Sequence, residues 1–367
     1  MKRTLLLLTL FFLLVAPCAG QEAAKAETAS APELQKIVDE AARAAVARFA
    51  EKGFGEKHLA VTLVDLTDPK KVRRASFRGA EPIYPASVVK LFYLVAAHRW
   101  LEDGKLKESE ELNRALRDMI VDSSNDATHF IVDAVSGVSN GAELSPAELK
   151  EWSERRNVFN RYFASLGYEV GPGRNNINQK PWCEGPYGRE RQFLGPNFEN
   201  RNKLTTDATA TLLTDIVLGR AVTPARSARM LELMKRDFSG KSEDPDDQAH
   251  GFTGIALEPG VRYWSKAGWT STTRHDAAYL ELPSGRRLVL VTFTTDHAKE
   301  RDIIPTVARE VLKKFRVSRS EFRVKDKSSS LTRSSERETR NFFMAFAPAR
   351  PSSSSRWVRG GRSGGAR

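Results

Sequence analysis

The sequence predicts an α/β (α+β composite) fold, in which an antiparallel sheet built from both ends of the chain is faced by helices and interrupted by a mostly helical insert. Three observations predict it. Two strand-like runs follow a first amphipathic helix, helical patterns fill the middle of the chain, and three strand-like runs precede a closing helix. With 40% apolar residues, the 367-residue chain can bury a substantial core.

The first half of the predicted sheet is a hairpin. Residues 34–49 carry apolar side chains at helical spacing, and residues 58–68 and 72–79 have strand character on either side of a turn-like segment. Residues 86–101 then form a helix that is apolar on nearly all faces and ends at Asp103-Gly104. We expect this helix to be buried at the centre of the domain.

The middle and the end of the chain supply the insert and the second half of the sheet. Gly, Pro, Asn and Arg dominate residues 169–203, which predicts a long loop, and loops of this length inside a compact domain are usually functional. The other predicted elements are helices at 108–120, 127–135, 206–222, 223–237 and 300–316 and strands at 263–271, 276–282 and 286–296.

The first 20 residues have the layout of a secretory signal peptide. Lys2 and Arg3 precede an apolar run from Leu5 to Val15, and small residues follow. We expect cleavage near Gly20, a short leader over 21–32 and a periplasmic or secreted protein. An uncleaved anchor is the alternative, but the apolar run is short for a bilayer. Lipidation of Cys18 is another, although a proline directly precedes that cysteine.

The net charge of +12 is concentrated at the ends of the chain. Residues 317–367 hold 12 Lys and Arg against 4 Asp and Glu, and the first 20 residues add +2, so the predicted domain over 33–316 is close to neutral. A neutral body argues against a nucleic-acid groove in the folded domain. The Ser/Arg/Gly-rich tail is typical of a disordered segment, with weak contact to anionic surfaces as its alternative function.

Cysteine usage limits the cofactor chemistry. Once the signal peptide is removed, Cys183 is the only cysteine, so the sequence predicts neither an internal disulfide nor a cysteine-based zinc site. We expect no metal, no cofactor and a monomeric protein.

The first chemical motif is Ser87-Val88-Val89-Lys90. Three residues on a helix are almost one turn, so the hydroxyl and the amine project from the same side. A serine hydroxyl needs a base to become a nucleophile, and a lysine can accept its proton when burial lowers the pKa of the amine. The pattern is weak by itself, because a helix-start serine and a surface lysine produce it by chance.

Two further elements follow in a fixed order: Ser123-Ser124-Asn125 between two helices, and Lys266-Ala267-Gly268 at the start of a strand. Together with Ser87 and Lys90 they resemble the S-x-x-K, S-D-N and K-T-G elements of the class A β-lactamase and β-lactamase-related serine hydrolase family, the penicillin-interacting serine enzymes. The resemblance covers about residues 33–316 and implies a β-lactamase/transpeptidase-like sheet with flanking helices.

The resemblance implies a role for each matching residue. Ser87 would be the acylated nucleophile and Lys90 its base or proton relay. Ser123 would shuttle the proton to the leaving nitrogen, Asn125 would hold the amide side chain of the substrate, and Lys266 would steady Ser123 and attract a substrate carboxylate.

Three further positions belong to the implied binding site. The backbone N–H groups of Ser87 and Trp269 would form the oxyanion hole next to Gly268. Arg274 and His275 lie about where such enzymes place a cation for the substrate carboxylate, and a strand-surface pair is the equal alternative.

The departures from the family pattern bear on the fate of the acyl-enzyme. No E-x-x-L-N sequence is present, so Glu190 and Glu184 compete as the base for the deacylating water, with solvated loop residues as the alternative for both. Ala267 replaces the threonine of K-T-G, Ser124 replaces the aspartate of S-D-N, and the interval between the first two elements is short.

The sequence therefore predicts an exported serine hydrolase that cleaves an amide bond of a small molecule or peptide, such as a β-lactam, through an acyl-enzyme on Ser87. The alternative is a catalytically weak, penicillin-binding-like protein that binds cell-wall peptides or is only acylated.

Overall fold

The computed structural model describes residues 29–171, 173–183 and 185–315. These residues belong to one compact unit, Met1–Phe315. The predicted signal peptide, most of the predicted leader, Glu184 and the predicted basic tail lie outside the described residues. The residues in these described ranges form no helix that is long and apolar enough to cross a membrane.

A seven-stranded sheet with the order β1-β3-β2-β7-β6-β5-β4 forms the centre of this unit. The first strand pairs with β3 in parallel, and every other pairing is antiparallel. The predicted composite sheet is thereby confirmed, since β2 and β3 from the first part of the chain join β5, β6 and β7 from the last part. The strands are β1 Ala29–Ser30, β2 Leu59–Asp65, β3 Arg73–Phe77, β4 Lys235–Arg236, β5 Arg262–Trp269, β6 Thr273–Glu281 and β7 Arg287–Thr295.

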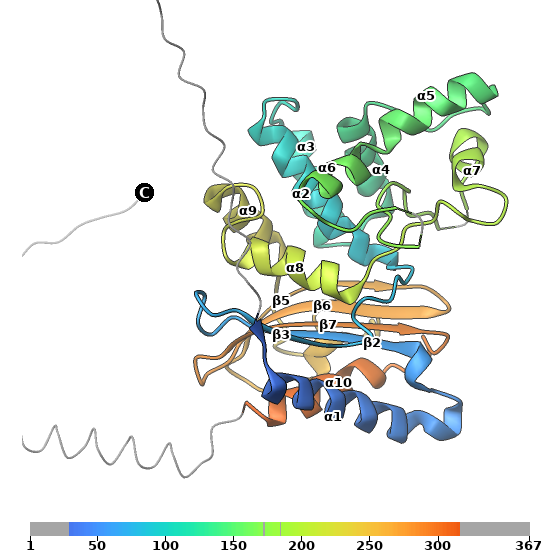
Figure 1. Ribbon diagram of the computed structural model, residues 1–367. Helices are drawn as coiled ribbons and strands as arrows, with labels where there is room; N and C mark the ends of the chain where they lie inside the picture. The colour runs from blue at the N-terminus through green and yellow to red at the C-terminus, as the bar shows by residue number, and fades with distance from the viewer. Residues whose placement is uncertain (1–28, 172, 184, 316–367) are drawn as a thin grey trace, which may run out of the picture. The chain divides into compact units, whose positions relative to one another are not determined.

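Helices cover both faces of this sheet (Figure 1). Helices α1 and α10 lie side by side on one face, and α8 and the buried α2 lie toward the other. The helices are α1 Pro32–Phe49, α2 Lys90–Glu102, α3 Glu110–Ile120, α4 Asn125–Ser136, α5 Pro146–Arg156, α6 Val158–Ser165, α7 Gly188–Leu194, α8 Thr206–Val217, α9 Pro224–Met234 and α10 Ile303–Lys313.

Alternation along β7 shows how the sheet separates two cores. Leu288 and Leu290 pack with the α1 and α10 residues, whereas Val289 and Val291 pack with the α2 and α8 residues. Successive side chains of a strand point to opposite faces, so this strand, which is buried except at its two ends, supplies both cores. As predicted, α2 is buried on nearly every face.

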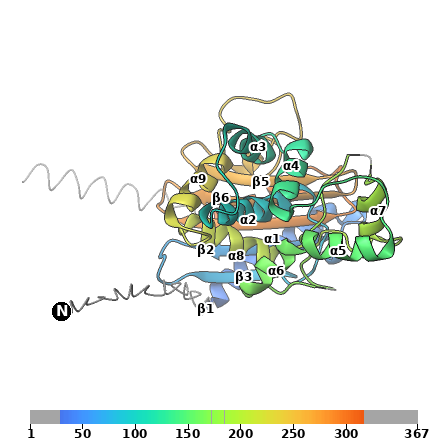
Figure 2. The same ribbon diagram turned by 90° about the horizontal axis from the view of Figure 1, so that it is seen from above.

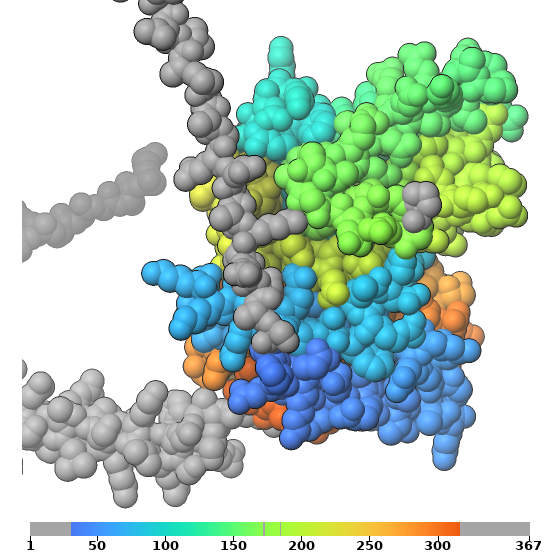
Figure 3. All heavy atoms as spheres, viewed as in Figure 1, coloured from blue at the N-terminus to red at the C-terminus, as the bar shows by residue number. Residues whose placement is uncertain are grey.

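The insert between β3 and β4 contains α2 to α9, and its helices stand over one face of the sheet (Figure 2). In the space-filling view, atoms of the insert and atoms of α1 occupy opposite ends of the visible face (Figure 3). The long predicted loop proves to contain a short helix, α7, which the Gly- and Pro-rich composition of its surroundings concealed.

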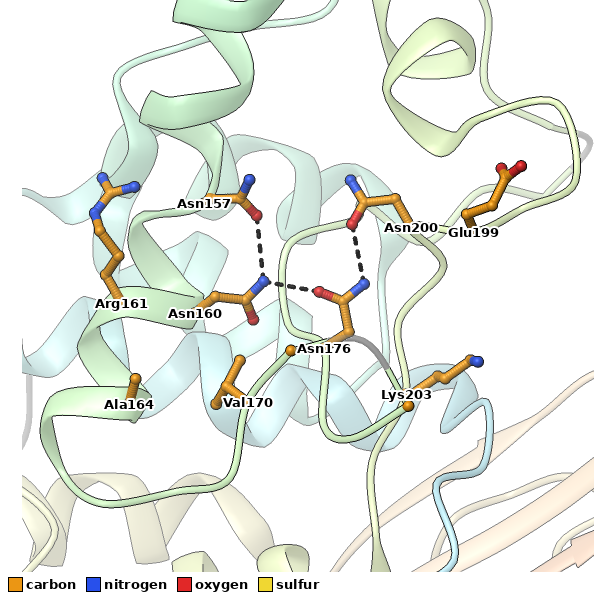
Figure 4. Close-up of a pocket in the computed structure, with 11 residues that line it drawn as sticks. Asn157, Asn160, Arg161, Ala164, Val170, Asn176, Glu199, Asn200 and Lys203 are labelled. Atoms are coloured by element: carbon orange, nitrogen blue, oxygen red, sulfur yellow. Dashed lines mark hydrogen bonds between the residues drawn. The ribbon is translucent and has the colours of Figure 1, made fainter.

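Asparagine side chains hold this long segment to α6 (Figure 4). Asn160 Nδ2 donates to Asn176 Oδ1 at 2.7 Å, and Asn176 Nδ2 donates to Asn200 Oδ1 at 3.1 Å. The buried Asn178 adds a donation to Asn157 Oδ1 at 2.9 Å. Asn157, Asn160, Asn176 and Asn200 line a pocket of about 520 Å³. Because these amides mostly satisfy one another, the network gives a segment with little regular structure a fixed shape.

Candidate active site

Ser87 lies in a single 3₁₀ turn, Ala86–Val89, which runs directly into α2. Residues three apart eclipse one another in a 3₁₀ turn, so the side chains of Ser87 and Lys90 leave the backbone on the same side. The preceding Ala86 has a φ of 45°, in the left-handed region that a residue with a Cβ rarely adopts. The strain at Ala86 marks the turn as a candidate functional site.

Lys90 is fully buried at the start of α2. Its Nζ atom donates to the backbone oxygen of Ser123 at 2.5 Å and to Asn125 Oδ1 at 2.8 Å, and it lies 3.3 Å from Ser123 Oγ. Burial lowers the pKa of Lys90 to about 7, because the charged form loses its hydration. A large fraction of Lys90 is therefore neutral near neutral pH and able to accept a proton.

Ser123 and Asn125 come from the connection between α3 and α4. Ser123 has a φ of 57°, a second left-handed residue at this site. Ser124, which replaces an aspartate of the family pattern, caps α4 by accepting from Ala127 N at 3.1 Å. The cap fixes the first residue of α4, Asn125, with its side chain toward Lys90.

Lys266 approaches the same hydroxyl from β5 and is fully buried. Its Nζ donates to Ser123 Oγ at 3.0 Å, to Gln248 Oε1 at 2.6 Å and to the Ala267 oxygen at 2.7 Å. Burial lowers the pKa of Lys266, and the positive charges of Lys90 and Arg236 lower it further, while Asp276 opposes them.

Both lysines have three acceptors within hydrogen-bond distance of Nζ. An ammonium group has three hydrogens and a neutral amine has two hydrogens and a lone pair, so these contacts fit the charged form of either lysine. Burial lowers the pKa of both, and the pKa of about 7 makes the neutral form of Lys90 available as a base near neutral pH.

Gly268 brings β5 against the turn that carries Ser87. A Cβ atom added at Gly268 would lie 2.7 Å from Ser87 N, 2.8 Å from Pro85 O and 2.9 Å from Val88 N. The end of β5, with Trp269 as its last residue, thus lies beside the backbone of Ser87. An oxyanion hole formed by the N–H groups of Ser87 and Trp269 needs these two segments to be neighbours, and they are.

Glu190 is in a different environment. It is fully buried, and its carboxylate accepts from Arg156 at 2.8 and 3.0 Å and lies 3.5 Å from Lys180 Nζ. Lys180 also pairs with Asp133 on α4 at 2.6 Å. The alternative of a solvated loop glutamate is wrong for Glu190, and its contacts do not support the prediction that it activates water, since cations hold both of its oxygens.

Arg274 and His275 also have partners that take them away from a substrate. The Arg274 guanidinium is almost fully buried, pairs with Asp246 at 2.5 Å and donates to Gly251 O at 2.6 Å. His275 lies between Tyr84 O, at 2.8 Å, and Thr294 N, at 3.2 Å. These contacts do not support the predicted carboxylate contact, and the alternative of a surface pair is wrong because both side chains are buried.

Two residues beside the site were not predicted from the sequence. Cys183 Sγ accepts from Asn125 Nδ2 at 3.3 Å, although 58 residues separate the two. Gln248 reaches Lys266 from the segment before β5. Both lie in irregular segments, where composition carries no information about which side chains point inward. No group of three or more His, Cys, Asp or Glu side chains within the described part of the chain is arranged to hold a metal ion.

Comparisons with known proteins bear on the family and the fold of the chain. The model of the β-lactamase enzyme family, Beta-lactamase2, matches residues 111–315, which include Ser123, Asn125 and Lys266. No curated protein matches the chain.

Solved structures match a larger part of the chain. A β-lactamase from Sphaerobacter thermophilus is 20% identical, with a TM-score of 0.53 over 76% of this chain and 96% of its own. A β-lactamase from Chitinophaga pinensis is 17% identical, with a TM-score of 0.54 over 77% and 100%. A PBP-A mutant, in an acyl-enzyme complex with penicillin G, is 19% identical, with a TM-score of 0.53 over 77% and 97%.

At these identities the solved structures show a shared fold and nothing more. The family model covers more than half of the chain. Its span contains the second and third motif elements, which hold Ser123 and Lys266, and the Lys266 amine contacts the Ser123 hydroxyl. The chain belongs to the β-lactamase enzyme family.

Proposed function

We propose that the protein is a serine hydrolase that opens amide bonds through an acyl-enzyme on Ser87. The observation that carries this proposal is the convergence of two buried lysines on Ser123 Oγ, with Lys90 one 3₁₀ turn after Ser87. A buried, neutral amine beside a serine is the activating base that such a nucleophile requires.

The reaction follows from this hydrogen-bond arrangement. Ser87 Oγ attacks the substrate carbonyl and gives its proton to Lys90, while the N–H groups of Ser87 and Trp269 stabilise the negative oxygen. Ser123 donates its proton to the leaving nitrogen, and Lys90 returns a proton to Ser123. The C–N bond breaks, an ester to Ser87 forms, and water later hydrolyses that ester.

The environment of Glu190 favours a second candidate, a penicillin-binding-like protein in which the acyl-enzyme persists. Glu190 accepts from Arg156 with both oxygens and is buried, which leaves it poorly placed to activate a water. Ala267 also lacks the hydroxyl of the family threonine. The two candidates share acylation and differ in the rate of the second step.

Intact-protein mass spectrometry after incubation with penicillin G tests the acylation step. We expect a mass increase of one penicillin in the wild type and none in Ser87→Ala. An unmodified wild type at high penicillin concentration would contradict the penicillin-directed form of the proposal, and a panel of activated esters and peptides would then test the hydrolase.

Turnover of a chromogenic cephalosporin separates the two candidates. Sustained turnover supports the hydrolase, whereas a single burst supports the penicillin-binding-like protein. Glu190→Gln is expected to lower the denaturation midpoint, because it removes a buried negative charge between two cations, and to leave the deacylation rate unchanged. A selective loss of deacylation in this variant would restore Glu190 as the base.

We also propose that the protein is exported to the periplasm or secreted. The proposal is supported by the cationic start and the apolar run of the first 20 residues. Sequencing of the N-terminus of the protein recovered from an expressing bacterium tests it, with a new terminus near residue 21 as the expected result.

A further inference from the structure

Gln248 connects two elements of the site through one buried side chain. Its Oε1 accepts from Lys266 Nζ at 2.6 Å and from Ala267 N at 3.2 Å, both on β5. Its Nε2 donates to the backbone oxygen of Val121 at 2.8 Å and to that of Ile120 at 3.2 Å, at the end of α3.

These partners fix the orientation of the amide. Two donors face its oxygen and two acceptors face its nitrogen, so a reversed amide would oppose donor to donor and acceptor to acceptor. No other neutral side chain of this length offers both functions. The main-chain oxygen of Gln248 is itself held by the Tyr263 hydroxyl at 3.4 Å, which limits the movement of the residue.

We propose that Gln248 is a positioning residue for the acylation step, because it forms hydrogen bonds both to Lys266 and to the segment that leads into Ser123. This inference rests on the proposed function. Val121 lies only two residues before Ser123, and Lys266 Nζ lies 3.0 Å from Ser123 Oγ. A single amide thus contacts Lys266 directly and the main chain two residues before Ser123.

Gln248 also accepts a hydrogen bond from Lys266 and so favours the charged form of this lysine. The titratable groups that act on Lys266 are Lys90 from α2, Arg236 from β4 and Asp276 from β6. Gln248 adds a neutral acceptor to this set, and a buried acceptor favours the ammonium form. Removal of that acceptor lowers the pKa of Lys266, and a carboxylate in its place raises it.

The variants Gln248→Met and Gln248→Glu test the proposal. Methionine keeps the length and removes all four hydrogen bonds, and glutamate keeps the acceptor for Lys266 but loses the donor to α3. Arg236 Nη2 also donates to Ile120 O at 2.9 Å, so one tie to α3 remains in both variants. Gln192→Met is the matched control, because Gln192 bridges the N–H and the oxygen of Leu144 at 2.8 and 3.0 Å in the same two-ended manner.

Two readouts are measured for each variant. The first is the rate of acylation by penicillin G against pH, and the second is the pH titration of Lys266 by NMR in protein with ¹³C-labelled lysine, assigned by the signal missing in Lys266→Arg. We expect Gln248→Met to be acylated by penicillin G roughly 10- to 100-fold more slowly than the wild type, because a small misplacement of the reacting groups slows the reaction. We also expect Lys266 to titrate at lower pH in this variant. We expect the Lys266 titration at higher pH in Gln248→Glu and no change of either readout in Gln192→Met.

A Lys266 titration that is unchanged in both Gln248 variants would overturn the proposal, as would wild-type acylation in Gln248→Met. If Gln248→Met does not fold, the Lys266 titration in Gln248→Glu tests the proposal, with a titration at higher pH than in the wild type as the expected result. A wild type that penicillin does not acylate argues against the proposed function, while the titration still judges the role of Gln248.

Discussion

The charge of Lys90 decides when the candidate nucleophile can act. No carboxylate contacts this fully buried lysine among the described residues, and its acceptors are two carbonyl groups and a hydroxyl. A buried ammonium without a negative partner is costly, so the neutral amine is favoured as soon as the pH allows it. Burial alone therefore makes Lys90 available as the proposed base, without an acidic partner.

The acylation rate is expected to rise with pH and to level off above about 7, the pKa to which burial lowers Lys90. Below that pH the amine is protonated and cannot accept the proton of Ser87, so the rate should fall about tenfold for each pH unit. Single-turnover acylation measured from about pH 5 to 9 checks this. A rate that is flat, or that falls over this range, would exclude Lys90 as the base.

At the scale of single residues, the resemblance predicted that Lys90, Ser123 and Lys266 belong to one site, and the structure brings these three together. The residues that hold them in place, such as Gln248, were not predicted. Arg274 shows why the same reasoning fails elsewhere, because its partner Asp246 lies 28 residues earlier in an irregular segment and no local pattern reveals the pairing.

At the scale of elements, β5 packs directly against the turn Ala86–Val89. The absence of a side chain at Gly268 allows it, since all three atoms that an added Cβ would meet belong to the backbone. Backbone atoms cannot rotate aside as a side chain does, so any larger residue must separate the strand from the turn.

We expect Gly268→Ala to reduce acylation by about 100-fold, because the turn and strand must move apart near the candidate oxyanion hole. Gly55→Ala is the control, because Gly55 has no atom within 4 Å of an added Cβ and a negative φ. Acylation rates and denaturation midpoints of both variants check this. Unimpaired acylation in Gly268→Ala would show that β5 does not contribute to the reacting geometry.

Regular elements were predictable where one periodicity dominates. The apolar pattern identified α1, α2 and β7, whose buried faces follow directly from it. The shape of residues 169–203 was not predictable, because asparagine amides and a buried group of charges hold that segment. Such contacts join distant positions and leave no periodic trace.

At the scale of the whole molecule, the sheet makes the two ends of the described chain depend on each other. Helices α1 and α10 pack against one another on one face, and β2 pairs with β7 along its full length. The site lies on the opposite side, in the insert and on β5. Its geometry therefore depends on strands from both parts of the chain.

A chain that ends at residue 315 is expected to fold and to be acylated at the wild-type rate, because the sheet, its helices and every residue of the candidate site belong to the unit Met1–Phe315. A chain that begins after Phe49 should fail to fold, since it lacks the apolar face of α1. Circular dichroism and penicillin labelling of both check this. A shortened chain that folds but resists labelling would assign residues 316–367 a part in the reaction.

The contact between Cys183 and Asn125 gives the site a chemical handle. Cys183 is exposed, and no second cysteine occurs in the mature chain that we propose. A thiol-directed fluorophore would therefore attach at one position, one hydrogen bond away from the residue expected to hold the substrate amide. Its emission would report the arrival and departure of a ligand in real time, including ligands that leave no covalent mark on Ser87.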